Sequence, residues 1–336
     1  FDSVATLLNG CGISGPVIFN IQPGTYVDNL HLQFVPGVTS TNTITFNGTN
    51  GQDSLIYNGQ SYQSTVLIEG TKYVTLNDMT IVNNGTSESF GIMLKDNSDS
   101  VTISNNTILM DTTGSGIDIT AILTASVYDN DLSEGSEVDY LTIVGNEIIG
   151  AVYGINLEGD GTGDFSIGHR ILNNHLSSQV TYGIYLDELQ DIEIIGNTID
   201  NVRGTTDGIY AFDLNDFRVE NNAIYVSDYG LYITDGNDGF APASRSTLIN
   251  NMVSSTSDYG IYLNDFELVE VYHNTAYGSP GMAINDQDSV WVINNVFVSD
   301  NDFAFESFDN FNGSETVDYN AYESGNSNAF DIGTSS

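Results

Sequence analysis

The residues best suited to chemistry are tyrosines and aspartates that recur at regular intervals in the second half of the chain. Each tyrosine is the third residue of an element with the pattern Gly-apolar-x-apolar, and an aspartate follows it within a few residues. The tyrosines are Tyr185, Tyr210, Tyr232 and Tyr262. The aspartates are Asp187, Asp213, Asp235 and Asp265, with Asp286 one copy further on. Because apolar residues flank each tyrosine, we expect its ring to face solvent while its neighbours face a core.

Two compatible interpretations of this pattern remain open. Flat rings beside hydrogen-bond acceptors suit a neutral sugar, and tyrosines on neighbouring strands also stabilise a sheet as a cross-strand ladder. The four aspartates are in addition weak candidates for catalysis, because a glycosidase needs two carboxylates. Neighbouring strands would place them about 5 Å apart. Any acidic column offers that spacing, so the sequence does not single out a catalytic pair.

The charge of the chain excludes several classes of protein. The 336 residues include 6 Lys and Arg against 45 Asp and Glu, which gives a net charge of −39. So few bases cannot form the basic stripe that nucleic acid requires, and an anionic membrane surface would repel the chain. No apolar run reaches the roughly 18–20 residues of a membrane span, so we expect no membrane insertion. With 40% hydrophobic residues, the chain can still build a sizeable core.

An internal repeat predicts the elements that must position these residues. A short strand followed by two polar residues recurs from VTLNDMTI (74–81) to ETVDYNAY (315–322), with successive asparagines separated by 21 to 40 residues. A buried Asn at such a bend can bond both the backbone and the Asn of the next turn. The predicted ladder consists of Asn106, Asn146, Asn174, Asn197, Asn222, Asn251, Asn274, Asn295 and Asn320.

The Gly-apolar-x-apolar element alternates with the first one, and the two together indicate a solenoid. Its copies are 91–94, 116–119, 154–157, 183–186, 208–211, 230–233, 260–263 and 281–284. A period of two or three short strands, none able to bury its inner face alone, predicts an all-β parallel β-helix of about twelve coils. We expect a single domain overall, with an N-terminal cap (1–16), the β-helix (17–322) and a tail or the start of a linker (323–336). Within the cap, residues 2–9, ended by Gly10, predict a short helix.

The repeats resemble those of the right-handed parallel β-helix superfamily, the pectin-lyase-like fold. The opening GPVIFNIQPGTYVDNLHL (15–32), followed by TNTITFNG (41–48), is also similar to the start of β-helix domains in secreted and cell-surface proteins of Bacteroidota. This resemblance implies a right-handed solenoid and an extracellular or cell-surface location. It also leads us to expect a larger, multidomain surface protein.

The resemblance also bears on the enzymes that use this fold. The Asn-Thr-Asp, Asp-Asp and Gly-His-Gly motifs of the polygalacturonases are absent from the sequence. Lyases of this fold use Arg or Lys as the base, and this chain has few of either. We expect Arg170, Glu193 and Arg218 to form a salt-bridged column across three coils rather than a catalytic site.

One loop has the composition of a calcium site. Glu158, Asp160 and Asp164 alternate with glycines and offer oxygen ligands to a hard cation, although they lack the Gly and Glu positions of an EF-hand. No cofactor is required by any motif, and Ca²⁺ is the one cation that the sequence suggests.

These observations predict a β-helix domain with a structural, adhesive or glycan-binding role and no catalysis. Its partners would be neutral glycans or cell-surface components. The alternative is a carbohydrate-active enzyme, a glycoside hydrolase before a polysaccharide lyase, that uses the tyrosine and aspartate face.

Overall fold

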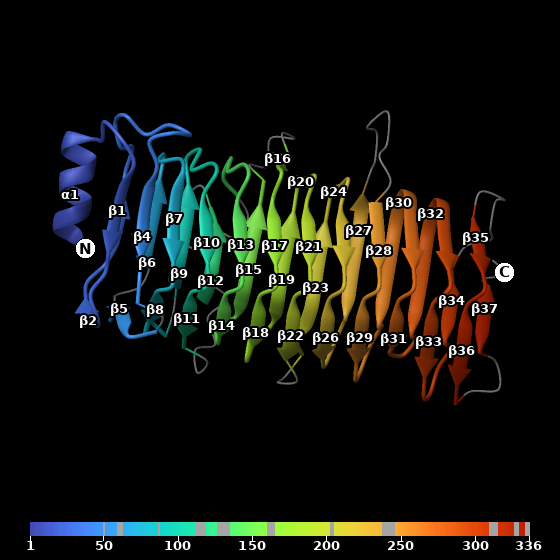
Figure 1. Cartoon of the computed structure of the whole chain (residues 1–336). Helices are drawn as coiled ribbons and strands as arrows, with labels where there is room; N and C mark the ends of the chain where they lie inside the picture. Colours follow the sequence, from blue (N-terminus) through green and yellow to red (C-terminus); the bar gives the residue numbers. More distant parts are fainter. Residues whose placement is uncertain are drawn as a thin grey trace. The chain divides into compact units, whose positions relative to one another are not determined.

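The computed structural model describes residues 1–49, 51–58, 63–86, 88–111, 119–125, 135–159, 165–201, 205–236, 246–308, 315–325 and 329–332. The chain divides into two compact units, unit 1 (Phe1–Val180) and unit 2 (Thr181–Ser336). Each unit is a parallel β-solenoid whose strands stack turn upon turn (Figure 1). The predicted fold class is therefore confirmed. Each turn runs through three strand rows, which we call row 1, row 2 and row 3.

Unit 1 begins with a helix, α1 (Asp2–Cys11), and continues with its strand rows. Row 1 consists of β1 (Val17–Asn20), β4 (Ile44–Asn47), β7 (Val74–Asn77), β10 (Thr102–Ser104), β13 (Thr142–Val144) and β17 (Arg170–Leu172). Row 2 consists of β2 (Gly24–Val27), β5 (Asp53–Tyr57), β8 (Thr80–Asn83), β11 (Thr107–Met110), β14 (Glu147–Ile149) and β18 (His175–Ser177). Row 3 consists of β3 (Leu30–Leu32), β6 (Gln63–Glu69), β9 (Ser89–Lys95), β12 (Ile119–Thr124) and β15 (Tyr153–Glu158), and a short strand, β16 (Ser166–Ile167), follows.

Unit 2 repeats the same order, and two of its strands are long enough to run from row 3 into row 1 of the next turn. These are β30 (Ile261–Tyr272) and β32 (Met282–Ile293). The other strands of row 3 are β19 (Tyr182–Asp187), β23 (Asp207–Phe212), β27 (Leu231–Gly236), β34 (Phe305–Ser307) and β37 (Phe330–Ile332). Row 1 also holds β21 (Glu193–Ile195), β25 (Arg218–Glu220), β28 (Ser246–Ile249) and β35 (Thr316–Asp318). Row 2 holds β22 (Thr198–Asn201), β26 (Ala223–Val226), β29 (Met252–Ser255), β31 (Thr275–Tyr277), β33 (Val296–Ser299) and β36 (Ala321–Ser324), and β20 (Leu189–Gln190) and β24 (Leu214–Asn215) are short connecting strands.

The number of turns is somewhat lower than predicted. Row 2 contributes one strand to each turn, but β2 and β36 contain no buried residue, whereas every other strand of this row buries at least one. The units together therefore have about ten turns with a packed inner face, against the twelve expected.

The bend between row 1 and row 2 explains the two polar residues of the repeat. The first of them has a left-handed backbone, for example Asn105 (φ 54°), Asn221 (φ 56°) and Asn250 (φ 56°). Asn and Gly tolerate this region best, and Gly145 and Gly196 take the same place in other turns. The second polar residue is the ladder asparagine, which points inward.

The predicted asparagine ladder is present within each unit. Asn222 is typical: its Nδ2 donates to the carbonyl oxygen of Ile194 (2.8 Å) and to Oδ1 of Asn251 (3.0 Å). Its own Oδ1 accepts from the backbone N–H of Asn197 (2.9 Å) and from Asn197 Nδ2 (3.0 Å). Such bonds join Asn106 through Asn146 to Asn174 in unit 1. In unit 2 they join Asn197 through Asn222, Asn251, Asn274 and Asn295 to Asn320.

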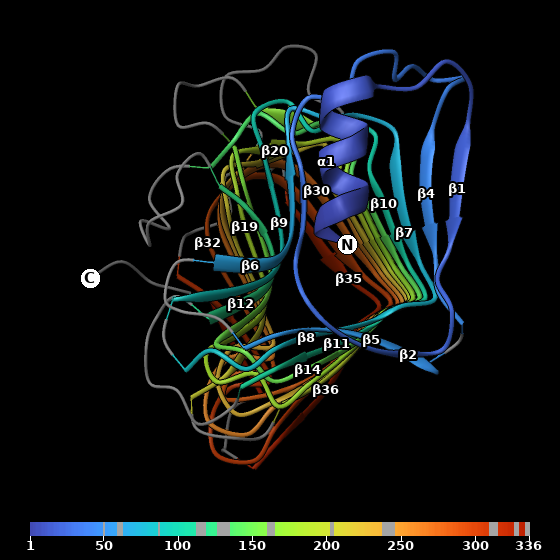
Figure 2. The same cartoon turned by 90° about the vertical axis from the view of Figure 1, so that its left-hand side faces the viewer.

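The helix α1 covers the end of the first turn, as the sequence predicts. Viewed from the N-terminal end, it lies between the row 1 strands β4 and β7 and the row 3 strand β9 (Figure 2). Ala5 and Leu8 are its buried residues, and Asn9 bonds the backbone of His31 and Gln33 beside β3. The helix continues past Gly10 to Cys11, because the left-handed residue that ends it is Gly12 (φ 67°). Among the described residues, no helix has the length and apolar character needed to cross a membrane.

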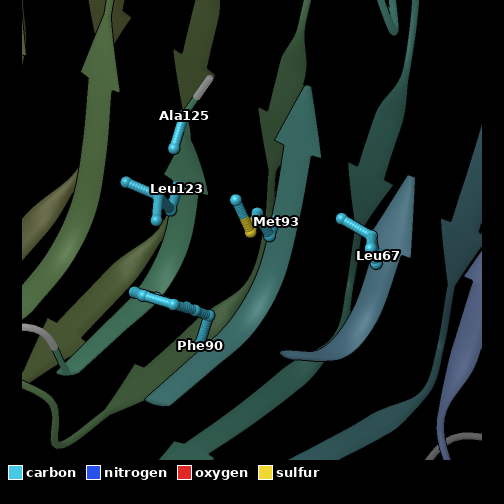
Figure 3. Close-up of a cluster of buried hydrophobic side chains, with 5 residues drawn as sticks. All are labelled: Leu67, Phe90, Met93, Leu123 and Ala125. Atoms are coloured by element: carbon cyan, nitrogen blue, oxygen red, sulfur yellow. The ribbon is translucent and has the colours of Figure 1, made fainter. Parts of the chain in front are cut away.

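Row 3 of unit 1 is buried on its outer face as well as its inner one. Leu67, Met93 and Leu123 are paired in register on β6, β9 and β12, and they form a cluster with Phe90 and Ala125 (Figure 3). Their register corrects one predicted repeat. The second copy of the glycine element begins at Ala121 rather than at Gly116, because Ile122 pairs with Ile92.

The ladder generates a prediction about stability. Replacing Asn222 by Ala leaves the buried N–H of Asn197 and the carbonyl of Ile194 without their partners, so we expect a loss of about 2–5 kcal/mol in the free energy of unfolding. The matched control is Asn221→Gly, at the exposed left-handed neighbour, where we expect little change. Urea unfolding followed by circular dichroism measures both. Equal midpoints for the two variants would show that the ladder does not stabilise the fold.

Candidate functional site

The predicted tyrosines occupy one outward-facing column on row 3 of unit 2. Tyr185 pairs with Tyr210, Tyr210 with Tyr232, and Tyr232 with Tyr262. All four side chains are partly exposed. Their neighbours along each strand point into the core and are completely buried, as in Ile184 and Leu186. Period-two alternation therefore places the rings on the surface, as the sequence predicts.

The rings of this column stack face to face. The ring centroids of Tyr210 and Tyr232 are 4.4 Å apart with an interplanar angle of 9°, and those of Tyr232 and Tyr262 are 5.0 Å apart at 19°. Tyr185 and Tyr210 are more widely spaced, at 6.2 Å and 15°. The rings consequently form a cross-strand ladder that contributes to the stability of the sheet. In the next strand Ala283 takes the place of the tyrosine, so the column ends at Tyr262.

Further aromatic residues, which the sequence analysis did not single out, widen this column into a surface. Tyr229 and Tyr259 stack on each other at 5.7 Å and 5°, and each packs at an angle against a tyrosine of the column. Phe212 packs against Tyr210 on the opposite side, with centroids 5.1 Å apart. We call the whole set the tyrosine wall. It consists of Tyr182, Tyr185, Tyr210, Phe212, Tyr229, Tyr232, Tyr259 and Tyr262.

Steric crowding explains why a glycine begins each Gly-apolar-x-apolar element. A Cβ atom on Gly208 would lie 2.4 Å from the carbonyl oxygen of Gly230, and one on Gly230 would lie 2.4 Å from that of Gly260. Such distances are far shorter than any ordinary contact, so a side chain is excluded there. The close approach brings together the residues just before these glycines, which include Asp207, Tyr229 and Tyr259.

The predicted aspartate column is displaced by one residue at its first member. Because Tyr185 pairs with Tyr210, Glu188 rather than Asp187 is level with Asp213. Asp213, Asp235 and Asp265 follow the strand register, are exposed and have left-handed backbones (φ 44° to 56°). The side chain of Asp286 lies outside the described residues.

Asp187 is instead partly buried beside the aromatic rings. Burial, together with the negative charges of Asp213, Glu188 and Asp235, raises the pKa of its carboxyl to about 6. A group that titrates there is protonated in part of the physiological range, unlike an ordinary aspartate.

A chain of polar side chains runs beside the tyrosine column. Asn285 donates to Asn264 (2.6 Å), Asn264 donates to the hydroxyl of Thr234 (2.8 Å), and that hydroxyl donates to Asp235 (3.1 Å). Thr234, Asn264 and Asn285 lie two residues after Tyr232, Tyr262 and Ala283 on β27, β30 and β32. The wall therefore has a row of amides and a carboxylate along one side.

A second group of carboxylates, also missed from the sequence, lies along the other side of the wall. Asp207 is only 7% exposed, and one of its oxygens accepts the backbone N–H of Tyr229 (2.9 Å). Its pKa is raised to about 7, chiefly by burial and also by the charges of Asp228 and Asp258, against the lowering effect of the Tyr229 hydrogen bond. Burial is also the main cause of the raised pKa values of Asp228 and Asp258. The motif Ser-Asp-Tyr-Gly, which occurs at 227–230 and again at 257–260, is the sequence signal that could have revealed Asp228 and Asp258.

Two other predicted sites are described only in part. In the salt-bridge column, Arg218 contacts Glu193 (3.1 Å), as expected, and also Glu220 (2.7 Å). In the calcium loop, Asp160 and Asp164 lie outside the described residues. Glu158 is buried and accepts a bond from Asn156 Nδ2 (2.9 Å). Across the described parts of the chain, no three His, Cys, Asp or Glu side chains are grouped as metal ligands.

Comparison with known proteins supports the fold. The family model described as a right-handed beta helix region matches residues 132–297. Together with the stacked parallel turns, this match supports the predicted resemblance to the right-handed parallel β-helix superfamily. No curated protein matches the sequence.

Several solved structures share the architecture. The mannuronan C-5 epimerase AlgE4 A-module of Azotobacter vinelandii is similar with a TM-score of 0.69 and 11% identity, over 98% of this chain and 92% of that one. PfbA, a surface adhesin of Streptococcus pneumoniae, has a TM-score of 0.54 and 14% identity, over 89% and 84%. The GH136 lacto-N-biosidase of Eubacterium ramulus has a TM-score of 0.59 and 13% identity. The match covers 98% of this chain and 64% of that one. Identities this low show the fold alone.

The buried carboxylate generates a pH prediction. The pKa of Asp207 is raised from an ordinary 3.8 to about 7, so the folded protein holds this proton more tightly than the unfolded chain. Its effect is a loss of stability that develops as pH rises from about 4 to about 7 and persists above. Asp207→Asn keeps the oxygen that accepts the Tyr229 N–H but has no charge. We therefore expect the variant to have a higher free energy of unfolding than the natural protein at pH 8. At pH 4 the difference should be much smaller.

Urea unfolding at the two pH values measures this difference, and the exposed Asp191 supplies the control substitution Asp191→Asn. A stability difference for Asp207→Asn that is the same at pH 4 and pH 8 would contradict the assignment of a raised pKa.

Proposed function

We propose that this chain is a non-catalytic β-helix domain of an extracellular or cell-surface protein, and that its tyrosine wall binds neutral glycans. The observation that carries the proposal is the wall itself, eight contacting aromatic side chains on the outer face of one strand row. Unit 1 buries apolar side chains on the outer face of the same row, whereas unit 2 presents partly exposed tyrosines there. Stability alone does not require a phenol at an outward position.

The chemistry around the wall fits a sugar chain. Ring edges and faces contact the C–H groups of a pyranose, and tyrosine hydroxyls donate and accept hydrogen bonds. The amides of Asn264 and Asn285 and the carboxylates of Asp213 and Asp235 add donors and acceptors for hydroxyls. A net charge of −39 disfavours acidic polysaccharides, so the proposal names neutral ones. An adhesin among the proteins of similar fold supports a surface role.

Binding to an array of neutral and acidic polysaccharides tests this function. We expect retention of neutral glycans, no cleavage of them, and a loss of at least about fivefold in affinity for Tyr210→Ala, because Tyr210 is central to the stack. The matched control is Tyr225→Ala, since Tyr225 is an exposed tyrosine of β26 in row 2. Thermal melting shows whether each variant is folded. Equal glycan affinity for the folded Tyr210→Ala variant and the natural protein would refute the proposal.

A carbohydrate-active enzyme is the second candidate, and one observation favours it. Asp187, whose pKa is raised to about 6, lies near Asp213 and Asp235. Glycosidases use a carboxyl group with a raised pKa as the acid, next to a second carboxyl group. Glycoside hydrolases and epimerases are also among the proteins of similar fold. Reducing-end release from the glycans that bind, abolished by Asp213→Ala or Asp235→Ala, would replace the non-catalytic proposal with this one.

We also propose that Ca²⁺ binds near Glu158. Asn156 Oδ1 is buried and has no hydrogen-bond partner in the described part of the chain, and the buried carboxylate of Glu158 is adjacent to it. Oxygens of this kind are the ligands that Ca²⁺ prefers. We expect millimolar Ca²⁺ to raise the melting temperature relative to EDTA, and Glu158→Gln to reduce that rise. The exposed Glu147 provides the control, Glu147→Gln. Identical melting curves with Ca²⁺ and with EDTA would exclude the site.

A further inference from the structure

One end of the tyrosine wall is hollowed. A groove of about 380 Å³ is lined by Tyr229, Tyr232, Tyr259, Tyr262, Asn285 and Phe308. The four tyrosines are arranged as two stacked pairs, Tyr229 with Tyr259 and Tyr232 with Tyr262. Between the pairs the rings are inclined by 68° and 49°, with centroids 5.0 Å apart. The rings therefore form two walls that meet at an angle rather than one flat platform.

Carboxylates surround this groove. Asp258 and Glu306 interact electrostatically with Tyr259, and Asp228 and Asp258 do so with Tyr229. Burial, together with these negative charges, raises the pKa of both tyrosines to about 12, so the rings remain neutral phenols. The pKa of Glu306 is raised by burial and by the charges of Asp302 and Asp331.

Positive charge is scarce in the same unit. Of its Arg and Lys residues, Arg218 is the one that lies within the described residues, and it is bound to Glu193 and Glu220 on row 1. The groove thus combines aromatic rings with a negative potential that the described side chains do not neutralise. An anion is repelled from such a place, whereas a cation is attracted to it.

We propose that this groove binds an alkylammonium cation, with the tyrosine rings contacting its methyl groups and the surrounding carboxylates balancing its charge. A cation over the face of an aromatic ring is attracted by the negative charge density of that face. A quaternary ammonium has no N–H to satisfy, so rings serve it well, whereas a small inorganic cation prefers oxygen ligands and water. This ligand is of a different class from the neutral glycan proposed above, and its site does not depend on that function.

Titration with choline tests the proposal, followed by isothermal calorimetry and by tyrosine fluorescence. The control ligand is the neutral carbon isostere of choline, in which a tert-butyl group replaces the trimethylammonium group. We expect saturable binding of choline and at least about fivefold weaker binding of the isostere, because the two differ in charge but hardly in shape. Equal affinities would overturn the proposal, as would a failure of choline to bind.

Two substitutions locate the site. Tyr259→Ala removes one ring of the groove and should weaken choline binding at least about fivefold, whereas Tyr259→Phe keeps the ring and should bind within about twofold of the natural protein. Glu306→Gln removes a charge with almost no change in shape, and a weaker affinity for choline is expected. The Glu306→Gln variant still tests the site if Tyr259→Ala does not fold. Tyr225→Ala lies outside the groove lining, on β26 of row 2, and should leave choline binding intact. Unchanged choline affinity in a folded Glu306→Gln variant would contradict the proposal.

Discussion

The bond between one buried asparagine and the next is the interaction on which the rest of each unit depends. Every turn must bend between row 1 and row 2, and the bend leaves backbone groups inside the solenoid that water cannot reach. The ladder asparagine satisfies them, since its amide donates to a carbonyl in the preceding turn and its oxygen accepts from that turn's asparagine, as Asn222 does with Ile194 and Asn197. Because the same bond recurs from Asn106 to Asn174 in unit 1 and from Asn197 to Asn320 in unit 2, it also fixes the register between those turns.

The register between turns brings side chains that are distant in the sequence together on one surface. When Asn222 is level with Asn251, the strands that follow bring Tyr232 level with Tyr262, and the residues on either side of each tyrosine enter the core. The glycines before these strands allow the turns to approach closely, since a Cβ on Gly230 would collide with the backbone of Gly260. One repeat thus produces three features: the asparagine ladder inside, the column of glycines, and the tyrosine column outside.

The acidic character of the chain has a distinct arrangement on this surface. Exposed aspartates such as Asp213 and Asp235 follow the strands on one side of the tyrosine wall. On the other side, Asp207, Asp228 and Asp258 are held in places where burial raises the pKa of each. Partly desolvated carboxylates beside aromatic rings create a negative region that favours cations and neutral molecules over anions.

The sequence by itself determined the solenoid, the asparagine ladder and the outward tyrosine column, because period-two alternation and a recurrent Asn are local patterns that fold in the same way in every turn. It also anticipated α1, apart from its end at Gly12. The tertiary structure alone decided which residues share a level. It placed Glu188 rather than Asp187 beside Asp213, and Ala121 rather than Gly116 beside Gly91, because a one-residue change in loop length moves every later side chain. The angled tyrosine pairs and the buried Asp207 likewise arise only when turns stack, since ring contacts and desolvation depend on neighbours distant in the chain.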